Sequence, residues 1–249
     1  MGPRVVAVVQ ARTGSTRLPG KVLLDIAGVP MLDRVIRRLA RSERLDAVVV
    51  ATSTLPGDDA IVARCEVLRV PVVRGDALDV LSRYALAARE AEADVVVRVT
   101  SDCPFIDPVV VSTVVAALVD ADPPADYASN TLAPRTFPRG LDVEAFTAAA
   151  LYEADRDDDD PGTREHVTPF IQDTDRFRVV PVTWPEDLSS LRWTVDTDDD
   201  LEAARRLAQA FDGNLDTGWL DLLDAWQAHP EWQALNAHVE QKKVERDRP

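Results

Sequence analysis

Residues 5–21 read V-V-A-V-V-Q-A-R-T-G-S-T-R-L-P-G-K, a β-branched apolar run followed by a loop of glycine, hydroxyl and cationic side chains. A strand that ends in such a loop is how an α/β protein presents backbone amides and cations to phosphate. Gly14 and Gly20 let the backbone approach a ligand closely or adopt positive φ. The polar side chains suited to a phosphate are Arg12, Ser15, Arg17 and Lys21. The stretch therefore predicts the first strand of an α/β fold and a loop that binds a polyphosphate.

The loop differs from two familiar phosphate-binding patterns. A Walker A loop has four residues between its glycines and Ser or Thr after its lysine. Here five residues separate Gly14 from Gly20, and Val22 follows Lys21. The spacing also differs from the G-x-G-x-x-G of a dinucleotide site. The residues alone leave open a second interpretation, a basic surface loop between a strand and a helix.

The first half of the chain alternates between strand-like and helix-like segments. The nearly apolar runs that predict strands covered on both faces are Val5–Val9, Ala47–Thr52, Val72–Arg74 and Asp94–Val99. Helical stripes lie between or after them, at Leu32, Val35, Ile36 and Leu39, at Val80–Ala88 and at Val110–Leu118. This alternation predicts right-handed crossovers and a three-layer α/β/α, Rossmann-like fold with a mainly parallel sheet. Ligands of such sheets bind at the carboxyl ends of the strands.

The alternation loosens in residues 126–190, which we interpret as an insertion or flap over the sheet. Strand candidates there are Leu141–Ala145 and Phe177–Val182, and the acidic run Asp157–Asp160 suits a solvated loop. Whether this region carries a homodimer contact stays open.

Regular structure is expected again after residue 190. The predicted elements are a strand at Leu191–Thr194, a helix at Asp198–Phe211 and a packed helix at Trp219–Trp226. We expect one domain over residues 1–239 and a disordered tail at residues 240–249, where charged side chains leave no apolar stripe.

Composition narrows the class of protein. The 249 residues are 46% hydrophobic and 29% charged, which is ordinary for a globular domain. No apolar run reaches the ~18 residues of a membrane helix, and the N-terminus lacks the plan of a signal peptide. Cys65 and Cys103 suggest no disulfide framework, and three scattered histidines suggest no zinc site. We therefore expect a cytoplasmic protein without a membrane partner.

Charge is distributed unevenly along the chain. The net charge of −15 argues against a nucleic-acid partner. Residues 1–41 carry +6 and the remainder −21. An acidic protein repels a nucleotide unless attraction is local or metal ions intervene. The basic first segment can supply the local attraction, and aspartates elsewhere can supply metal ligands.

Motifs in a consistent order resemble one enzyme family over roughly the first 210 residues. The quoted blocks are Gln10–Leu23, Arg98–Pro108, Pro138–Glu144, Arg164–Pro169 and Arg192–Thr197. They resemble the cytidylyltransferases that activate acidic sugars, such as 3-deoxy-manno-octulosonate and acylneuraminate. The branch named for spore coat polysaccharide biosynthesis protein F is the most similar. The resemblance implies a nucleotidyltransferase fold, CTP and Mg²⁺, an acidic-sugar or small phosphonate or phosphate acceptor, and release of pyrophosphate.

The resemblance also assigns residues to roles. Lys21 and Arg12 would neutralise the phosphates, and Asp102 and Asp196, each after a strand candidate, would hold the metal. Lys21, Arg12 and Asp102 are thus the catalytic candidates. Nucleotide-binding candidates are Gln10, Ala11, Arg12, Gly14, Ser15, Lys21, Arg74, Arg83 and Thr100. Acceptor candidates are Asn130, Arg139, Asp142, Glu144, Arg164 and His166, of which the arginines suit an anion and the others a hydroxyl.

Structural interpretations stand beside these roles. Asp102 can form a turn or a helix cap, and Asp196 can begin a helix. Arg17 either binds phosphate or shapes the loop, and the base remains open among CTP, UTP and GTP. Asp196-Thr197-Asp198 also spells the D-x-D of metal-dependent glycosyltransferases. That activity, and a nucleotide-binding protein without catalysis, are the alternative functions.

Overall fold

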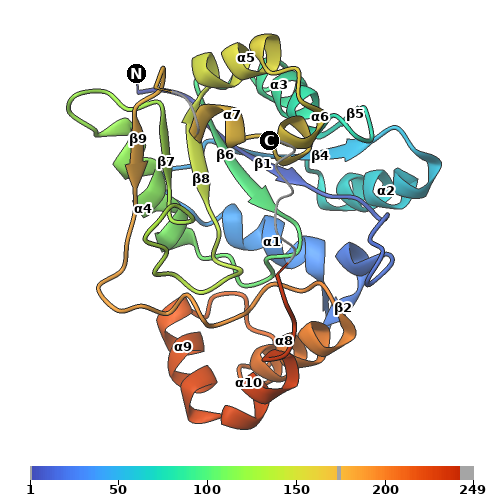
Figure 1. Ribbon diagram of the computed structural model, residues 1–249. Helices are drawn as coiled ribbons and strands as arrows, with labels where there is room; N and C mark the ends of the chain where they lie inside the picture. The colour runs from blue at the N-terminus through green and yellow to red at the C-terminus, as the bar shows by residue number, and fades with distance from the viewer. Residues whose placement is uncertain (1, 173–174, 242–249) are drawn as a thin grey trace.

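The computed structural model describes residues 2–172 and 175–241 and places a seven-stranded sheet between layers of helices (Figure 1). The strand order is β5-β4-β1-β6-β8-β7-β9. The first-half strands are parallel: β1 Val5–Gln10, β4 Ala47–Ser53, β5 Val72–Gly75 and β6 Val95–Thr100. These bounds confirm the four strand predictions to within two residues, and the mainly parallel α/β/α fold is confirmed with them.

Residues 126–190 extend this sheet, which differs from the expected flap over it. They contribute β7 (Tyr127–Ser129), β8 (Glu144–Thr147) and β9 (Val179–Pro181) at the edge beyond β6. Only β8 runs antiparallel to its neighbours. Their side chains explain the placement, because Tyr127 and Phe146 are fully buried and stack on one sheet face. Regular pairing in place of the expected strand at Leu141–Ala145 begins at Glu144, three residues later than expected.

Helices cover both sheet faces. The helices of the first half are α1 Met31–Leu39, α2 Asp59–Leu68, α3 Val80–Glu90 and α4 Pro108–Val119. Those of the second half are α5 Ala148–Asp157, α6 Pro161–His166, α7 Pro169–Gln172, α8 Asp198–Gln209, α9 Trp219–Ala228 and α10 Pro230–Asn236. Short 3-10 helices span Lys21–Leu23 and Pro56–Asp58, and a two-stranded ribbon joins β2 (Asp25–Ile26) to β3 (Val29–Pro30).

Alternate residues of each central strand feed two separate cores. In β1, Val5, Ala7 and Val9 pack with α1, α4 and α8, whereas Val6 and Val8 pack with α3 and α5. A strand buried on both faces needs apolar side chains at every position, which is why the run at residues 5–9 contains no polar residue. The predicted stripes on α1, α3 and α4 all face these cores.

Two of the cations in the basic first segment are structural. Arg38 is 1% exposed, and its guanidinium donates to the carbonyls of Ile106 (2.6 Å), Leu215 (2.7 Å) and Thr217 (3.0 Å). Arg34, also 1% exposed, donates to the carbonyls of Ile26 in β2 and of Gly213. The two arginines bind the segment before α9 to α1, so the local positive charge offered to a ligand is smaller than the sequence suggests.

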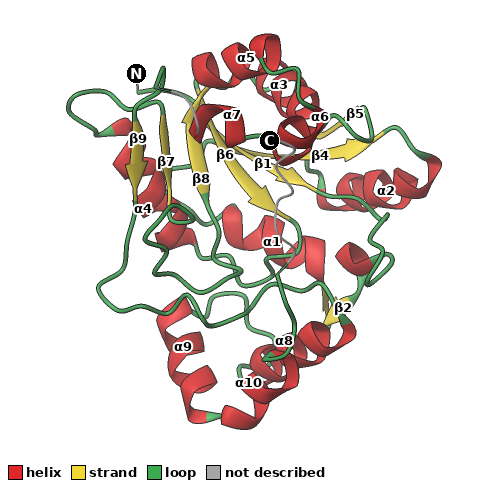
Figure 2. Cartoon of the chain, viewed as in Figure 1, coloured by secondary structure: helices red, strands yellow, loops and turns green. Residues whose placement is uncertain are grey.

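Helices α8, α9 and α10 lie below the sheet in this view and are linked to it by long loops (Figure 2). Residues Leu191–Thr194 do not form the expected strand, because a single bridge, Arg139 to Arg192, is their only β pairing among the described residues. Backbone bonds to Arg139 hold the segment, from the Arg139 amide to the Leu191 carbonyl (2.9 Å) and from the Trp193 amide to the Arg139 carbonyl (2.7 Å), together with the side chain of Arg192. The acidic run also differs from a solvated loop, since Asp158 is buried and Asp160 caps α6. Of the predicted tail, residues 242–249 lie outside the described part of the chain.

No helix within residues 2–172 and 175–241 combines the length and the apolar character that crossing a membrane requires.

Gly140 generates a prediction about stability. Its φ is +103°, and a Cβ there would lie 2.7 Å from the backbone nitrogen of Thr194. Gly28 also has positive φ, +82°, but open space around it. We expect Gly28→Ala to cost about 1–2 kcal/mol of unfolding free energy, from φ alone. Gly140→Ala should cost about 4 kcal/mol or more, because backbone must also move. Urea unfolding measures both, and equal losses would contradict the close packing of Gly140.

Candidate active site

The cationic loop and the Asp102 loop leave the sheet side by side. Gln10 ends β1, Thr100 ends β6, and the two are register partners in the parallel ladder. The amide of Ser101 donates to the carbonyl of Gln10 at 3.1 Å. Since both strands end at the same carboxyl edge, the residues that follow them face one region of space.

The loop over residues 11–20 is shaped by hydrogen bonds. The amides of Ser15 and Gly20 both donate to the carbonyl of Thr13, at 2.8 and 2.9 Å. Thr13 itself is held by Asp58, which accepts from its amide (2.7 Å) and its hydroxyl (2.8 Å). Gly20 has φ +68°, which allows the chain to turn into the 3-10 helix that carries Lys21. These bonds leave the loop's remaining amides available.

Four backbone amides of the loop have no acceptor among the described residues, those of Arg12, Gly14, Thr16 and Arg17. Free N–H groups on a tight loop form a concave anion site. The loop therefore has the backbone chemistry expected for phosphate.

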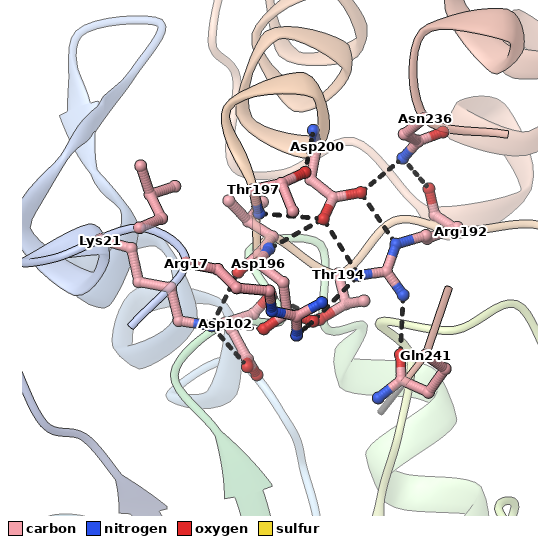
Figure 3. Close-up of polar contacts among 12 residues, drawn as sticks. Arg17, Lys21, Asp102, Arg192, Thr194, Asp196, Thr197, Asp200, Asn236 and Gln241 are labelled. Carbon is pink, nitrogen blue, oxygen red and sulfur yellow. Dashed lines mark hydrogen bonds and ion pairs between the residues drawn. The ribbon is translucent and has the colours of Figure 1, made fainter. Parts of the chain in front are cut away.

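The Lys21 ammonium joins the three distant segments of the site (Figure 3). Its Nζ donates to Asp102 Oδ2 (2.9 Å), to Asp196 Oδ1 (2.8 Å) and to the carbonyl of Val195 (2.8 Å). All three of its hydrogens are thus used by protein acceptors. Burial opposes the charged form of Lys21, but the two carboxylates outweigh burial and raise its pKa.

Asp196 is surrounded by cations. Beside Lys21 at Oδ1, its Oδ2 contacts Arg17 (3.0 Å) and Arg192 (2.9 Å). Burial alone would raise the pKa of this carboxyl, but Lys21, Arg17 and Arg192 together lower it below its usual range. Asp196 is therefore an ionised carboxylate that holds its orientation through several charge-assisted hydrogen bonds.

A pocket of about 280 Å³ opens over this cluster. Most of the sequence-predicted nucleotide and metal residues line it: Gln10, Ala11, Arg12, Gly14, Ser15, Lys21, Arg83, Thr100, Asp102 and Asp196. It also contains residues without a predicted role: Thr16, Val22, Val80, Ser101 and Glu165, the last an ion-pair partner of Arg12 at 3.6 Å. Arg17 lines it too, so both roles considered for Arg17 are compatible with its position.

A second polar pocket of about 270 Å³ adjoins the first, and Thr100 and His166 border both. Of the predicted acceptor residues, Asp142, Glu144 and His166 line it. Glu144 is buried and accepts from Arg98, Tyr127 and Thr168, so its carboxylate is fully engaged. Burial lowers the pKa of His166, which favours a neutral imidazole.

Sequence reasoning missed the arginines of this second pocket. Arg135 pairs with Asp142 and also donates to the carbonyls of Phe137 and Pro138, both at 3.3 Å. Arg98 pairs with Glu144. Arg98 opens a quoted motif block, which was a usable signal, whereas Arg135 lies in an irregular loop that gave none.

Four of the predicted site residues line neither of these two pockets, contrary to the prediction. Arg74 on β5 reaches the carbonyls of β4 and the loop after it, and Arg164 links α6 to Asp79 at the start of α3 and to Asp155 in α5. Asn130 is 1% exposed and bonds only backbone, at Leu141 and Val143. Arg139 lines a separate pocket of about 390 Å³ against α10. Their polar groups, apart from those of Arg139, are already satisfied by the fold.

The donor set fits one divalent cation bound together with phosphate. Asp102 and Asp196 already share the cation of Lys21, so their carboxylates converge on one point. Within the described residues no cluster of three or more His, Cys, Asp or Glu is arranged for a metal. Mg²⁺ needs only one or two carboxylates when phosphate oxygens and water complete its shell. The site thus suits a metal that arrives with a nucleotide.

The comparisons with known proteins agree with this geometry. The sequence profile of the cytidylyltransferase family matches residues 6–216. An uncharacterized protein of Methanocaldococcus jannaschii is 34% identical over 242 residues, 96% of this chain and 97% of the relative. Spore coat polysaccharide biosynthesis protein SpsF of Bacillus subtilis is 30% identical over 235 residues, 91% and 95% of the two chains.

A solved structure extends the match to three dimensions. A cytidylyltransferase from Leptospira borgpetersenii superposes with a TM-score of 0.89 at 30% identity, covering 97% of this chain and 99% of that one. The protein is therefore a nucleotidyltransferase enzyme, and the chain belongs to the cytidylyltransferase family. The resemblance inferred from its motifs is confirmed.

The lowered pKa of Asp196 predicts a pH-dependent contribution to stability. A carboxyl whose pKa is lower folded than unfolded stabilises the fold fully above its unfolded value, near 3.8, and loses this effect as pH falls through the folded value. We expect the difference in unfolding free energy between wild type and Asp196→Asn to be largest above pH 3.8 and to shrink below it. Urea unfolding at pH values on either side measures this. A pH-independent difference would show that the cations do not act on Asp196 as described.

Proposed function

We propose that the protein is a Mg²⁺-dependent cytidylyltransferase that couples CTP to a small acidic acceptor, an acidic sugar or a small phosphonate or phosphate, and releases pyrophosphate. The observation that carries the proposal is the Lys21 ammonium between Asp102 and Asp196, at the floor of a pocket beside a second polar pocket. One pocket suits the nucleotide and the other its acceptor. Thr100 and His166, on their shared border, mark where the two substrates meet.

The chain's own residues bind and orient the triphosphate. The free amides of the loop and the guanidinium of Arg12, which is half exposed, offer hydrogen bonds to its oxygens. Lys21 and Arg17, now bonded to Asp196, can exchange to the phosphate oxygens when these compete with the Asp196 carboxylate. A bound Mg²⁺ would be held by Asp102 and Asp196 and would supply charge stabilisation for the departing pyrophosphate. Access of water to Lys21 and Asp196 is limited, because both residues are at most 9% exposed.

The second pocket supports an acceptor with both a hydroxyl and an anionic group. The imidazole of His166 makes no hydrogen bond to a described residue and borders both pockets, and burial lowers its pKa, so it suits a proton acceptor for the attacking hydroxyl. Of the arginines Arg98 and Arg135, Arg135 is the one that an acceptor anion can recruit, because its partner Asp142 is 34% exposed and displaceable, whereas Glu144, the partner of Arg98, is 8% exposed. Glu144 is too fully bonded to act as a base.

The geometry disfavours the glycosyltransferase alternative. A D-x-D site needs both aspartates on the ligand, but Asp198 is exposed in the first turn of α8 and does not line the pocket that Asp196 lines. The inactive-binder alternative predicts CTP binding without turnover.

The decisive experiment measures pyrophosphate release by the purified protein with Mg²⁺, crossing four nucleoside triphosphates with a panel of acidic sugars, phosphonates and phosphates. We expect release with CTP and one acceptor class, and none when EDTA replaces Mg²⁺. Transfer from a nucleotide sugar without pyrophosphate would instead support a glycosyltransferase. CTP binding with no release for any acceptor would support the inactive binder.

Lys21→Met and Asp102→Asn test the proposed roles directly. Each removes one charge at the position where the phosphates are bound, so we expect kcat/KM to fall about 10²- to 10³-fold or more. Circular dichroism should show that both remain folded. Arg156→Met removes a charge that is 67% exposed and should retain wild-type turnover. Near-normal turnover in either site variant would remove the basis of the proposal.

Arg135→Ala tests the acceptor pocket. Loss of a charge-assisted contact to an anionic group should raise the acceptor KM about tenfold or more, with the KM for CTP nearly unchanged. Arg135→Lys, which keeps the charge, should have an acceptor KM between those of Arg135→Ala and the wild type. An equal rise in both KM values would indicate that Arg135 only shapes the loop, and Arg156→Ala serves as the matched control.

A further inference from the structure

The three cations around Asp196 are held with unequal firmness. Arg17 comes from the phosphate loop, its side chain is 28% exposed, and Asp196 is its only ion-pair partner among the described residues. Lys21 also comes from that loop segment. Arg192 is different, because its side chain is 7% exposed and lies on the side of Asp196 away from the loop (Figure 3).

Arg192 is fixed by partners that do not face the nucleotide pocket. Asp200, whose side chain is fully buried, binds it bidentately, with Nε to Oδ1 at 2.8 Å and Nη2 to Oδ2 at 3.0 Å. A bidentate fork fixes the guanidinium plane as well as its position. The same Nη2 then donates to Asp196 Oδ2 at 2.9 Å. Asp200 therefore fixes the orientation of the Asp196 carboxylate through the guanidinium of Arg192.

Asp200 also holds the backbone of Asp196. Its Oδ2 accepts from the amides of Asp196 (3.0 Å) and Thr197 (3.1 Å), completing the capping box of α8. From α10, the side-chain amide of Asn236 donates through Nδ2 to Asp200 Oδ1 (2.9 Å) and to the carbonyl of Arg192 (3.1 Å). Asp196 is thus held at side chain and backbone by one buried group.

We propose that Arg192 and Asp200 are positioning residues that hold Asp196 in the orientation needed to bind the metal–nucleotide complex. Arg192 is the permanent partner of Asp196, and Lys21 and Arg17 are partners that exchange to phosphate when the nucleotide arrives. Because Arg192 does not leave, Asp196 keeps its orientation during the exchange. This inference rests on the proposed function, since it concerns the same carboxylate.

The test compares CTP binding in Mg²⁺ with CTP binding in EDTA, by calorimetry and without acceptor, so that no turnover occurs. Arg192→Lys keeps the charge but loses the fork that bridges Asp200 and Asp196. We expect the ratio of the two affinities to fall about tenfold or more, as for other residues that orient metal ligands. Asp198→Asn removes a charge from an exposed position in the same first turn of α8 and should keep the wild-type ratio.

Each result decides between roles. A folded Arg192→Lys protein with the wild-type ratio overturns the inference, and so does an equal loss of affinity in Mg²⁺ and EDTA, which a purely structural role predicts. If Arg192→Lys does not fold, Asn236→Ala decides in its place. It removes two hydrogen bonds made by a residue that does not line the nucleotide pocket, and a reduced ratio supports the inference, whereas an unchanged ratio overturns it. A wild-type ratio of one would instead refute the metal dependence in the proposed function.

Discussion

The site depends on one ammonium group between two carboxylates. Lys21 lies 81 residues from Asp102 and 175 from Asp196, and its Nζ is the atom at which the three segments meet. Backbone bonds reinforce the meeting point, since the amide of Val195 donates to the carbonyl of Asp102 at 2.9 Å. A buried ion pair contributes little net stability, but it penalises arrangements in which either charge is left alone. The pairing therefore acts mainly by specifying how the segments assemble.

Much of the fold followed from periodicity, because both kinds of apolar pattern have direct physical causes. Strands buried on two faces need continuous apolar runs, such as the one at Val5–Val9, and helices on a sheet need a stripe, such as Leu32 to Leu39 on α1. The same reasoning could not place residues 126–190, since β7 and β9 are three residues long. Nor could it show that Leu191–Thr194 forms only a bridge to Arg139 and is fixed by the side chain of Arg192, because neither Arg139 nor Asp200 is identified as a partner by the local pattern.

The site was predictable where function requires a local pattern. The phosphate loop and the two aspartates follow strand candidates or stand within distinctive motif blocks, so their convergence could be anticipated. Residues that act through long-range pairing could not. Arg164 stands in a block as distinctive as that of Lys21, and Asn130 was a candidate outside the blocks, yet the polar groups of both are used by the fold. Only the partner reveals the difference, and a partner such as Asp79 is 85 residues away from Arg164.

Charge pairing explains how an acidic protein can admit a polyphosphate. In the cluster, Lys21, Arg17 and Arg192 are balanced by three carboxylates, those of Asp102, Asp196 and Asp200. A triphosphate that takes Lys21 and Arg17 leaves Asp102 and Asp196 without their mobile cations, which is costly in a buried place. Under the proposed function, binding of nucleotide alone would therefore be opposed, and binding of nucleotide with a divalent cation would not. The carboxylates would then couple nucleotide and cation, because each ligand removes the electrostatic penalty that the other creates.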